Sequence, residues 1–281
     1  MLEGFSDQHL WFNVGQNWVE KENKGSVLGY DYSPTSLAFG YDYDIIPNSF
    51  TLGVALSYAY GDVKGKGGSE IYSRSEVDEY LASMYWKYKP IRAYTTGSVG
   101  GGVIQNKTKL ATDSVNTRGE YDTGVLFSNI EVGYDLGNAC YVFEPFVGAD
   151  YSYMVAEAYD EKGIGARHFS RNSYNTLELP IGFRVSRNLV WNNFIFTPAL
   201  ELAYARNVGD RNVSINSYFV GASESSWAVV GNPDDRDSIR SKINMKINNL
   251  SIPFAFNVGY ARDTRANYSD DQLYLTVRYN F

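Results

Sequence analysis

The sequence predicts an all-β protein, a closed antiparallel transmembrane β-barrel of about twelve strands. Three observations predict this fold. Apolar residues occupy every second position of the last segment, at Leu273, Leu275, Val277, Tyr279 and Phe281. The same alternation recurs along most of the 281 residues. Short and long polar connections alternate between these segments, as they do in a membrane barrel, whereas a β-sandwich has no reason to alternate them.

Composition supports a barrel and excludes several other classes. Aromatic residues make up 16% of the chain, with 24 Tyr and 15 Phe, as expected if aromatic girdles mark both membrane interfaces. The mean hydropathy of −0.33 and the lack of a long apolar run exclude a helical span. A net charge of −7 argues against a nucleic-acid partner. The single Cys140 excludes an internal disulfide, and we expect no metal site and no cofactor.

The first three predicted strands show the pattern most clearly. The first covers residues 10–20, with Leu10, Phe12, Val14 and Trp18 facing lipid. The second covers 37–45 and the third 50–60, joined by a tight turn at Pro47. Such a pair of regular strands with a short connection predicts a hairpin.

The remaining strands follow with the same rhythm. The segment with Gly100, Gly101 and Gly102 has the least defined faces, because glycine blurs the alternation. Short turns are expected at 89–90, 137–138, 188–193 and 248–249. Longer loops are expected at 20–25, 61–75, 110–120, 156–172, 207–236 and 261–271. The strands between them are expected at 80–88, 92–107, 126–136, 141–153, 177–186, 194–204, 238–246, 252–260 and 272–281.

Charged residues fall on the face opposite the apolar one. In a barrel this face lines the lumen, where charges let a polypeptide slide without an apolar trap. The alternative is that the charges only solvate one another and hold the barrel's shape. The predicted pore-lining residues are Asp42, Asp44, Glu131, Glu144, Asp150, Glu178, Arg184, Glu201 and Arg278.

Catalysis is not expected in this barrel. A Ser–His–Asn hydrolase site needs a histidine on a strand near a serine, but His9 precedes the predicted barrel and His168 lies in a polar loop. Asp42 and Asp44 could form an acid–base pair, but they precede a short turn, away from the long loops. The protein is therefore expected not to be an enzyme.

In several ordered motifs the chain resembles the translocator domain (β-domain) of autotransporters, the type V secretion systems. The resemblance covers about residues 10–281. The terminal strand ending on Phe281 resembles the assembly signal of bacterial outer-membrane barrels, which would comprise Leu273, Leu275, Val277, Tyr279 and Phe281. The other matching elements, in order, are Trp11 and residues 40–42, 52–58, 143–148, 179–184, 218–222 and 227–231.

The resemblance implies a twelve-stranded barrel that ends a longer polypeptide, anchors it in the bacterial outer membrane and carries an N-terminal passenger to the cell surface. It also implies a helix within the pore, of which residues 1–9 would be a remnant, followed by the barrel at 10–281. The expected partners are outer-membrane lipid and lipopolysaccharide, the passenger and the barrel-assembly machinery, with the barrel a monomer. No signal peptide precedes the first strand, so Met1 is expected to begin a trimmed fragment.

Three alternatives stay open at this point. One is a small porin-like channel, and another is an outer-membrane hydrolase. The third is self-cleavage of the passenger inside the pore, for which the inward carboxylates Asp150, Glu178 and Glu201 are candidates.

Overall fold

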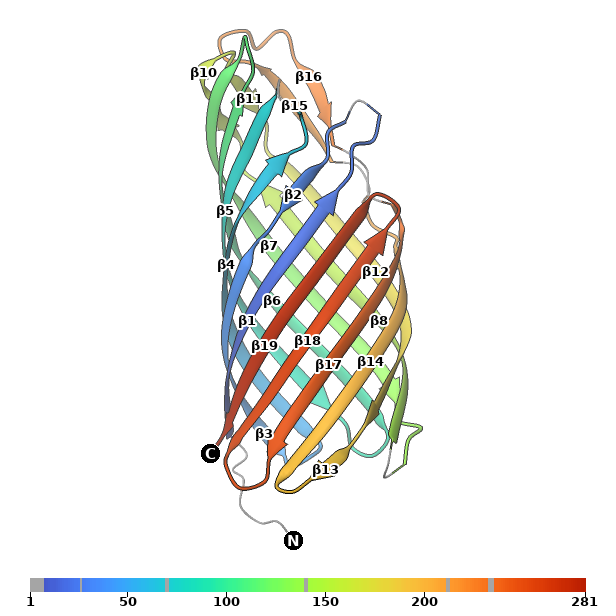
Figure 1. The fold of residues 1–281 in the computed structure, drawn as a ribbon. Helices are drawn as coiled ribbons and strands as arrows, with labels where there is room; N and C mark the ends of the chain where they lie inside the picture. Colours follow the sequence, from blue (N-terminus) through green and yellow to red (C-terminus); the bar gives the residue numbers. More distant parts are fainter. Residues whose placement is uncertain (1–7, 26, 69–70, 139–140, 211–212, 232–234) are drawn as a thin grey trace.

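The computed structural model is a closed antiparallel barrel of twelve long strands (Figure 1). It describes residues 8–25, 27–68, 71–138, 141–210, 213–231 and 235–281. Cys140 lies outside these residues. The predicted fold class is confirmed. The barrel strands are β1 (Gln8–Lys21), β3 (Thr35–Ile46), β4 (Phe50–Gly65), β5 (Tyr72–Tyr88), β6 (Ala93–Ala111), β7 (Asn116–Tyr134), β8 (Tyr141–Ala156), β12 (Asn172–Arg187), β14 (Phe194–Asn207), β17 (Asp237–Asn249), β18 (Phe254–Arg265) and β19 (Tyr268–Asn280).

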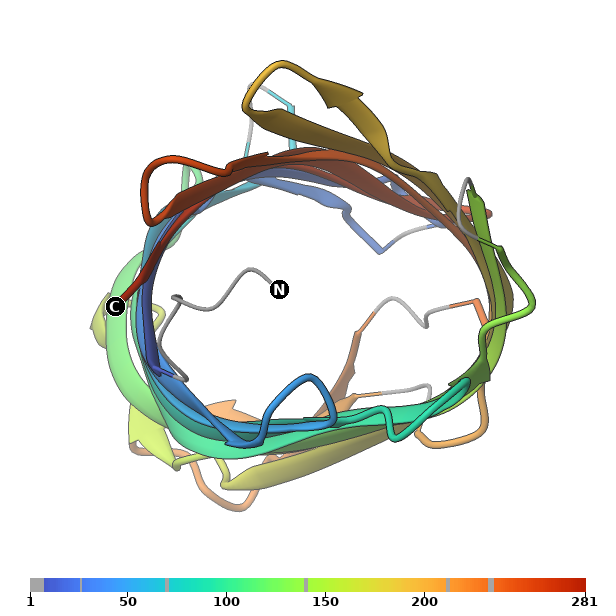
Figure 2. The same cartoon turned by 90° about the horizontal axis from the view of Figure 1, so that it is seen from below.

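The ring closes where the first strand meets the last. β1 pairs with β19 without a break, from His9 opposite Asn280 to Lys21 opposite Tyr268. Viewed along the axis, the strands form a continuous wall around a lumen (Figure 2). β1 begins at the same end of the barrel at which the chain ends, and this is the expected periplasmic end (Figure 1). Closure pairs the backbone groups of both edge strands, as a lipid environment requires.

The two faces of the wall are reversed relative to a water-soluble protein. Large apolar side chains are on the outer surface, among them Leu56, Ile239 and Ile243, each at least 60% exposed. The buried apolar cluster consists of Tyr94, Phe146 and Ala203. An exposed apolar band of this extent is stable only in contact with lipid. Of the residues described, none belongs to a helix long and apolar enough to cross a membrane.

Inward-facing aromatic rings lie over glycines of the neighbouring strand. Tyr94 of β6 faces Gly133 of β7, where an added Cβ would lie 2.4 Å from the ring. The same arrangement joins Trp11 to Gly40. Each glycine therefore provides the space that the ring fills, and the pair fixes the register between its two strands.

Several predicted loops are shorter than expected, because the strands continue beyond the lipid band. Residues 61–75 and 110–120 are largely strand, as β4 ends at Gly65, β5 begins at Tyr72, β6 ends at Ala111 and β7 begins at Asn116. The prediction of a long loop at 261–271 was wrong, since β18 and β19 are joined by a two-residue turn. Polar residues in these segments suggested loops, but a strand that stands in water has no need of apolar residues.

Short strands extend the wall at both ends. β2 (Tyr30–Tyr32) pairs with β1 and β4, and β10 (Lys162–Ile164) pairs with β7. β13 (Leu189–Trp191) lies in the expected turn 188–193. In the two longest connections, β9 (Tyr159–Asp160), β11 (Arg167–Phe169), β15 (Ser214–Phe219) and β16 (Trp227–Val230) form a separate four-stranded sheet.

This small sheet stands at the end opposite the periplasmic one (Figure 1). An aromatic stack anchors it to the barrel, with Tyr159 between Tyr121 at 4.5 Å and Phe169 at 5.0 Å between ring centroids. The buried Glu161 pairs with Arg167 through two hydrogen bonds of 2.9 Å. The expected extracellular loops 156–172 and 207–236 are therefore partly ordered into one sheet.

The predicted remnant of a pore helix at 1–9 has only its last two residues in the described part of the chain. There, Gln8 and His9 belong to strand β1. Residues 1–7 lie outside the described residues.

We expect Gly133→Val to destabilise the barrel, because the new side chain would displace the Tyr94 ring and its hydrogen bond of 2.8 Å to Glu131. Overpacking of this kind costs about 1–3 kcal/mol. Heat- or urea-induced loss of the folded band in detergent measures the effect. Gly124→Val on the same strand is the matched control, since an added Cβ there meets nothing within 4 Å. Equal destabilisation by both variants would contradict the proposed role of the ring.

Candidate functional site: the charged lumen

The nine predicted residues and their partners fall into three groups on the inner wall, here called periplasmic, central and extracellular. The periplasmic group is built around Asp42 of β3, which is 2% exposed. The Tyr85 hydroxyl donates a hydrogen bond of 2.9 Å to its carboxylate, and Arg278 Nη2 approaches it to 2.6 Å. Trp11 Nε1 donates to the Tyr85 hydroxyl at 2.5 Å. The group thus ties β1, β3, β5 and β19 together across the seam.

Asp44 lies nearer the same mouth of the barrel. It accepts a hydrogen bond of 2.5 Å from Thr51 Oγ1 and lies 3.5 Å from His9 Nε2. A cavity of about 700 Å³ opens here, lined by residues of opposite walls that include Asp42, Lys87 and Arg278. Asp42 and Asp44 therefore face the periplasmic mouth, each bonded to a neighbour.

The central group is held by Arg184 of β12. Its guanidinium lies 2.6 Å from Glu201, 3.4 Å from Glu131 and 3.5 Å from Glu144. Lys89 also contacts Glu144, at 3.1 Å. One arginine thus links carboxylates from three other strands, which a sequence of alternating residues cannot reveal.

The periplasmic turn after β7 adds a further ion pair to this group. Lys89 Nζ donates to Asp135 at 2.9 Å, and the Gly137 amide donates to the same carboxylate. Partial burial opposes ionisation, but these two hydrogen bonds outweigh it and lower the pKa of the Asp135 carboxyl. Asp135 is therefore ionised at neutral pH and fixes the Lys89 side chain at the rim.

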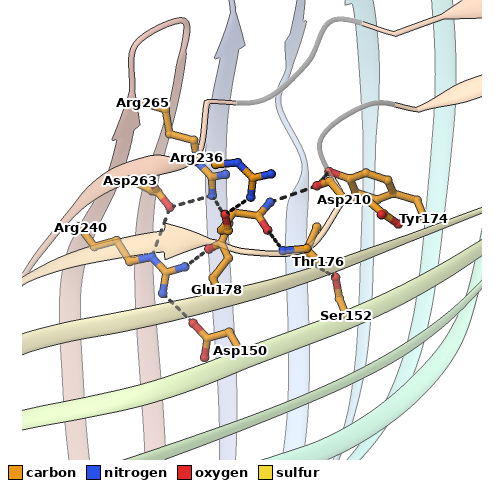
Figure 3. A network of polar contacts seen from close by, with 12 residues as sticks. Asp150, Ser152, Tyr174, Thr176, Glu178, Asp210, Arg236, Arg240, Asp263 and Arg265 are labelled. Carbon is orange, nitrogen blue, oxygen red and sulfur yellow. Dashed lines mark hydrogen bonds and ion pairs between the residues drawn. The ribbon is translucent and has the colours of Figure 1, made fainter.

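The third group lies in the extracellular half (Figure 3). Arg240 of β17 contacts Asp150 at 2.7 Å, Asp263 at 3.4 Å and Glu178 more closely still. Arg265 Nη2 lies 2.7 Å from the other oxygen of Glu178. A cavity of about 580 Å³ is lined by Asp150, Glu178 and Arg265.

The structure places all nine predicted residues in these groups, but it adds partners that the sequence did not single out. Asp263 and Arg265 were missed, since residues 261–271 were expected to be a loop. Arg240 lies in the expected strand 238–246 but was not singled out. The alternation of Arg240, Lys242, Asn244 and Lys246 in β17 was a signal that could have identified Arg240. Of the three candidate carboxylates for self-cleavage, Asp150 and Glu178 share Arg240, while Glu201 belongs to the central group.

The surroundings of His168, as the structure describes them, do not form a Ser–His–Asn arrangement. His168 lies in the extracellular sheet with Nδ1 2.6 Å from Asp160 and its ring stacked on Tyr218. The nearby Ser217 hydroxyl donates to the His168 backbone carbonyl and not to the ring. Among the described residues, no group of three or more His, Cys, Asp or Glu could hold a metal ion.

The comparisons with known proteins agree with this geometry. The model of the autotransporter β-domain family matches residues 10–260. The chain belongs to this family. It is accordingly the translocator and anchor domain of a protein of the bacterial outer membrane.

Two autotransporter structures share its fold. The translocator domain of the autotransporter NalP from Neisseria meningitidis has a TM-score of 0.77 and 11% identity, covering 98% of this chain and 89% of that one. The β-domain of the Bordetella autotransporter BrkA has a TM-score of 0.71 and 14% identity, covering 98% and 100%.

Among curated relatives, esterase EstA of Pseudomonas aeruginosa is 23% identical over 179 residues, covering 57% of this chain and 27% of that protein. Outer membrane protein A of Rickettsia conorii is 24% identical over 203 residues, covering 62% of this chain and 9% of that protein. The autotransporter β-domain described here thus spans about a quarter or less of the length of these relatives.

We expect Arg184→Met to lower the free energy of unfolding, because Glu131, Glu144 and Glu201 would then face one another without their shared cation. The loss should be about 2 kcal/mol, below that for a dry ion pair, because the Arg184 side chain remains 30% exposed to the lumen. Urea titration of the folded barrel in detergent measures it. Arg187→Met, on the outer face of the same strand, is the control and should change stability little. A loss of equal size in both variants would refute the importance of the central group.

Proposed function

We propose that this barrel anchors a longer autotransporter in the outer membrane and carries that protein's N-terminal passenger through or with its lumen to the cell surface. Family membership carries the proposal. The geometry supports it, because β1 starts at the periplasmic end, so polypeptide that precedes β1 joins the barrel at that mouth (Figure 1). In the proposal, residues 1–9 join the passenger linker to the barrel at 10–281.

The lumen suits the passage of a chain because its charges are compensated. The nine residues proposed to line the pore are held in ion pairs or hydrogen bonds with other strands. They therefore present a polar surface without a strong net attraction for a passing polypeptide. Such pairing is worth little in water but keeps the side chains against the wall. The same pairing would also hold the barrel's shape, which was the alternative interpretation of these charges in the sequence.

The proposed partners follow from this role. They are the passenger polypeptide, the lipid and lipopolysaccharide that surround the barrel, and the machinery that assembles outer-membrane barrels. We propose a monomer, since the ring closes within one chain, and no nucleic-acid partner.

No catalytic step is assigned to the barrel. The relative EstA is named an esterase, but its match covers 27% of that protein, so the name need not describe the matched part. Self-cleavage of a passenger, with Asp150, Glu178 and Glu201 as candidate carboxylates, stays a prediction. A porin-like channel is the weaker alternative.

The passenger role can be tested by fusing a signal peptide and a folded reporter ahead of residue 1. We expect the reporter to become accessible to protease added to intact cells. The control replaces residues 8–281 with an unrelated outer-membrane porin, which should leave the reporter inaccessible. Reporter retained in the periplasm beside a correctly folded barrel would refute the proposal. In a planar bilayer, steady porin conductance from protein that retains its native linker would instead favour the channel.

The terminal strand is proposed as the assembly signal. Phe281 is 39% exposed, its ring lies 5.4 Å from that of Tyr279, and its amide donates to Gln8 across the seam. We expect Phe281→Asp to abolish accumulation in the outer membrane, because a carboxylate would replace the apolar end of the lipid-facing row. Phe281→Tyr, which keeps the ring, should assemble normally. The amount of folded, heat-modifiable protein in outer-membrane fractions measures assembly. Wild-type levels of Phe281→Asp would refute the role of the terminal strand as the assembly signal.

A further inference from the structure

A row of five basic residues crosses five neighbouring strands near the extracellular end of one wall. Each residue lies directly opposite the next, in the order Lys64, Arg74, Lys109, Arg118 and Lys162. These residues, here called the outer basic row, come from β4, β5, β6, β7 and β10. Four consecutive barrel strands and the small strand β10 therefore build one continuous line of cations.

The outer basic row faces away from the lumen. On β4, Lys64 follows the lipid-facing Val54 and Leu56 at even intervals of two residues, and directly opposite residues share a face of the sheet. Lys64, Lys109, Arg118 and Lys162 are exposed. The row is therefore accessible from outside the barrel.

Four consecutive pairs of like charges are unfavourable in an antiparallel sheet. Compensation within the chain is incomplete. Arg74 pairs with Asp62 at 2.8 Å and Lys109 with Glu76 at 3.5 Å, but Lys64, Arg118 and Lys162 form no ion pair with any described residue.

The next row toward the membrane contains Asp62, Glu76, Lys107 and Glu120, so the two rows hold six cations and three carboxylates. This excess of positive charge stands on a chain of net charge −7. Repulsion that the fold tolerates at one place, in an otherwise acidic protein, indicates an anionic ligand at that place.

The height of the row narrows the class of ligand. Lys64 lies four residues beyond Tyr60, an outward tyrosine that is 57% exposed. Four residues extend about 13 Å along a strand, or about 10 Å along the barrel axis after strand tilt. Phospholipid headgroups add only about 5–8 Å to each side of the hydrocarbon. The row therefore stands above the phospholipid headgroups, on a wall that continues past the β18–β19 hairpin (Figure 1).

We propose that the outer basic row binds the phosphate and carboxylate groups of the core saccharide of lipopolysaccharide, a glycolipid whose anionic sugars fill the layer just outside the membrane. The five cations extend over about 19 Å, the width of four strand spacings, enough for several anionic groups of one saccharide. Arg118, which forms no ion pair with a described residue, supplies a forked donor that suits phosphate. The proposal rests on the outer-membrane location and not on the passenger role, so each can fail without the other.

The test is a binding titration of the refolded chain in detergent with three probes at about 0.15 M salt, where exposed charges are screened beyond about 8 Å. The probes are rough-type lipopolysaccharide with a phosphorylated core, the same molecule after removal of the core phosphates, and lipid A without core sugars. We expect the first to bind at least about tenfold more tightly than the others, since each lost phosphate contact removes a paired charge near the surface.

The test variant combines Lys64→Gln, Arg118→Gln and Lys162→Gln, the three cations without an ion pair. We expect it to lose at least about tenfold in affinity for the phosphorylated-core probe. The control combines Arg187→Gln, Arg206→Gln and Arg262→Gln, which removes three outward charges from other strands, two of them in ion pairs with Asp237 and Asp271. Its affinity should stay within about twofold. If the triple variant does not fold, Lys162→Gln alone, on the small strand β10, replaces it as the test variant. It should still measurably weaken binding of the phosphorylated-core probe.

Three outcomes would overturn the proposal. The first is unchanged affinity of the Lys64, Arg118 and Lys162 variant. The second is equal binding of lipid A without core sugars, which would place the contact at the membrane surface. The third is binding of soluble heparin in preference to every lipopolysaccharide probe, which would indicate a soluble polyanion instead.

Discussion

The backbone of this protein must pair all of its N–H and C=O groups within the hydrocarbon of a membrane, and the pairing of β1 with β19 is what makes that possible. An open sheet would leave two edges unpaired in lipid, at several kcal/mol for each unsatisfied group. The seam runs unbroken from His9 to Lys21 on β1. It is reinforced inside the lumen by the Trp11–Tyr85–Asp42–Arg278 group, whose members come from strands on both sides of the closure.

Closure also decides where the two kinds of side chain go. With water inside and lipid outside, the apolar residues cover the outer surface and the charged residues face one another across the lumen. The charges are grouped around Arg184, Arg240 and Arg278, each of which contacts carboxylates of other strands. These groups link the side chains of strands that all belong to the same hydrogen-bonded ring, including strands that are not direct neighbours. Their compensation leaves the lumen polar, which suits the proposed passage of a passenger.

The wall is uneven in height, and this asymmetry links the lumen to the outer surface. β4 to β7 continue well beyond the lipid band, while β18 and β19 end in a two-residue turn. The taller wall supports the four-stranded extracellular sheet on one side through the Tyr121–Tyr159–Phe169 stack, and it carries the outer basic row. Above the membrane the outer face of the wall need not be apolar. Its residues can therefore be polar or charged and can bind molecules outside the bilayer.

The period of two, read along the sequence, determined the strand number, the outward and inward faces and the closed barrel, because lipid on one side and water on the other impose that period on every spanning strand. It also predicted the nine inward charges on β3, β7, β8, β12, β14 and β19. It did not determine where strands end. In the water-exposed part of the wall, the strand residues have no apolar face to mark them, and they were predicted to be loops. These residues are 61–65, 72–75, 110–111, 116–120, 261–265 and 268–271. Only the tertiary structure decided that Glu131, Glu144 and Glu201 share Arg184, that Arg240 joins Asp150 to Glu178, and that five separate basic residues form one row. Such contacts depend on the register between strands distant in sequence, and register is set by closure of the ring and by the aromatic–glycine pairs, not by any local pattern.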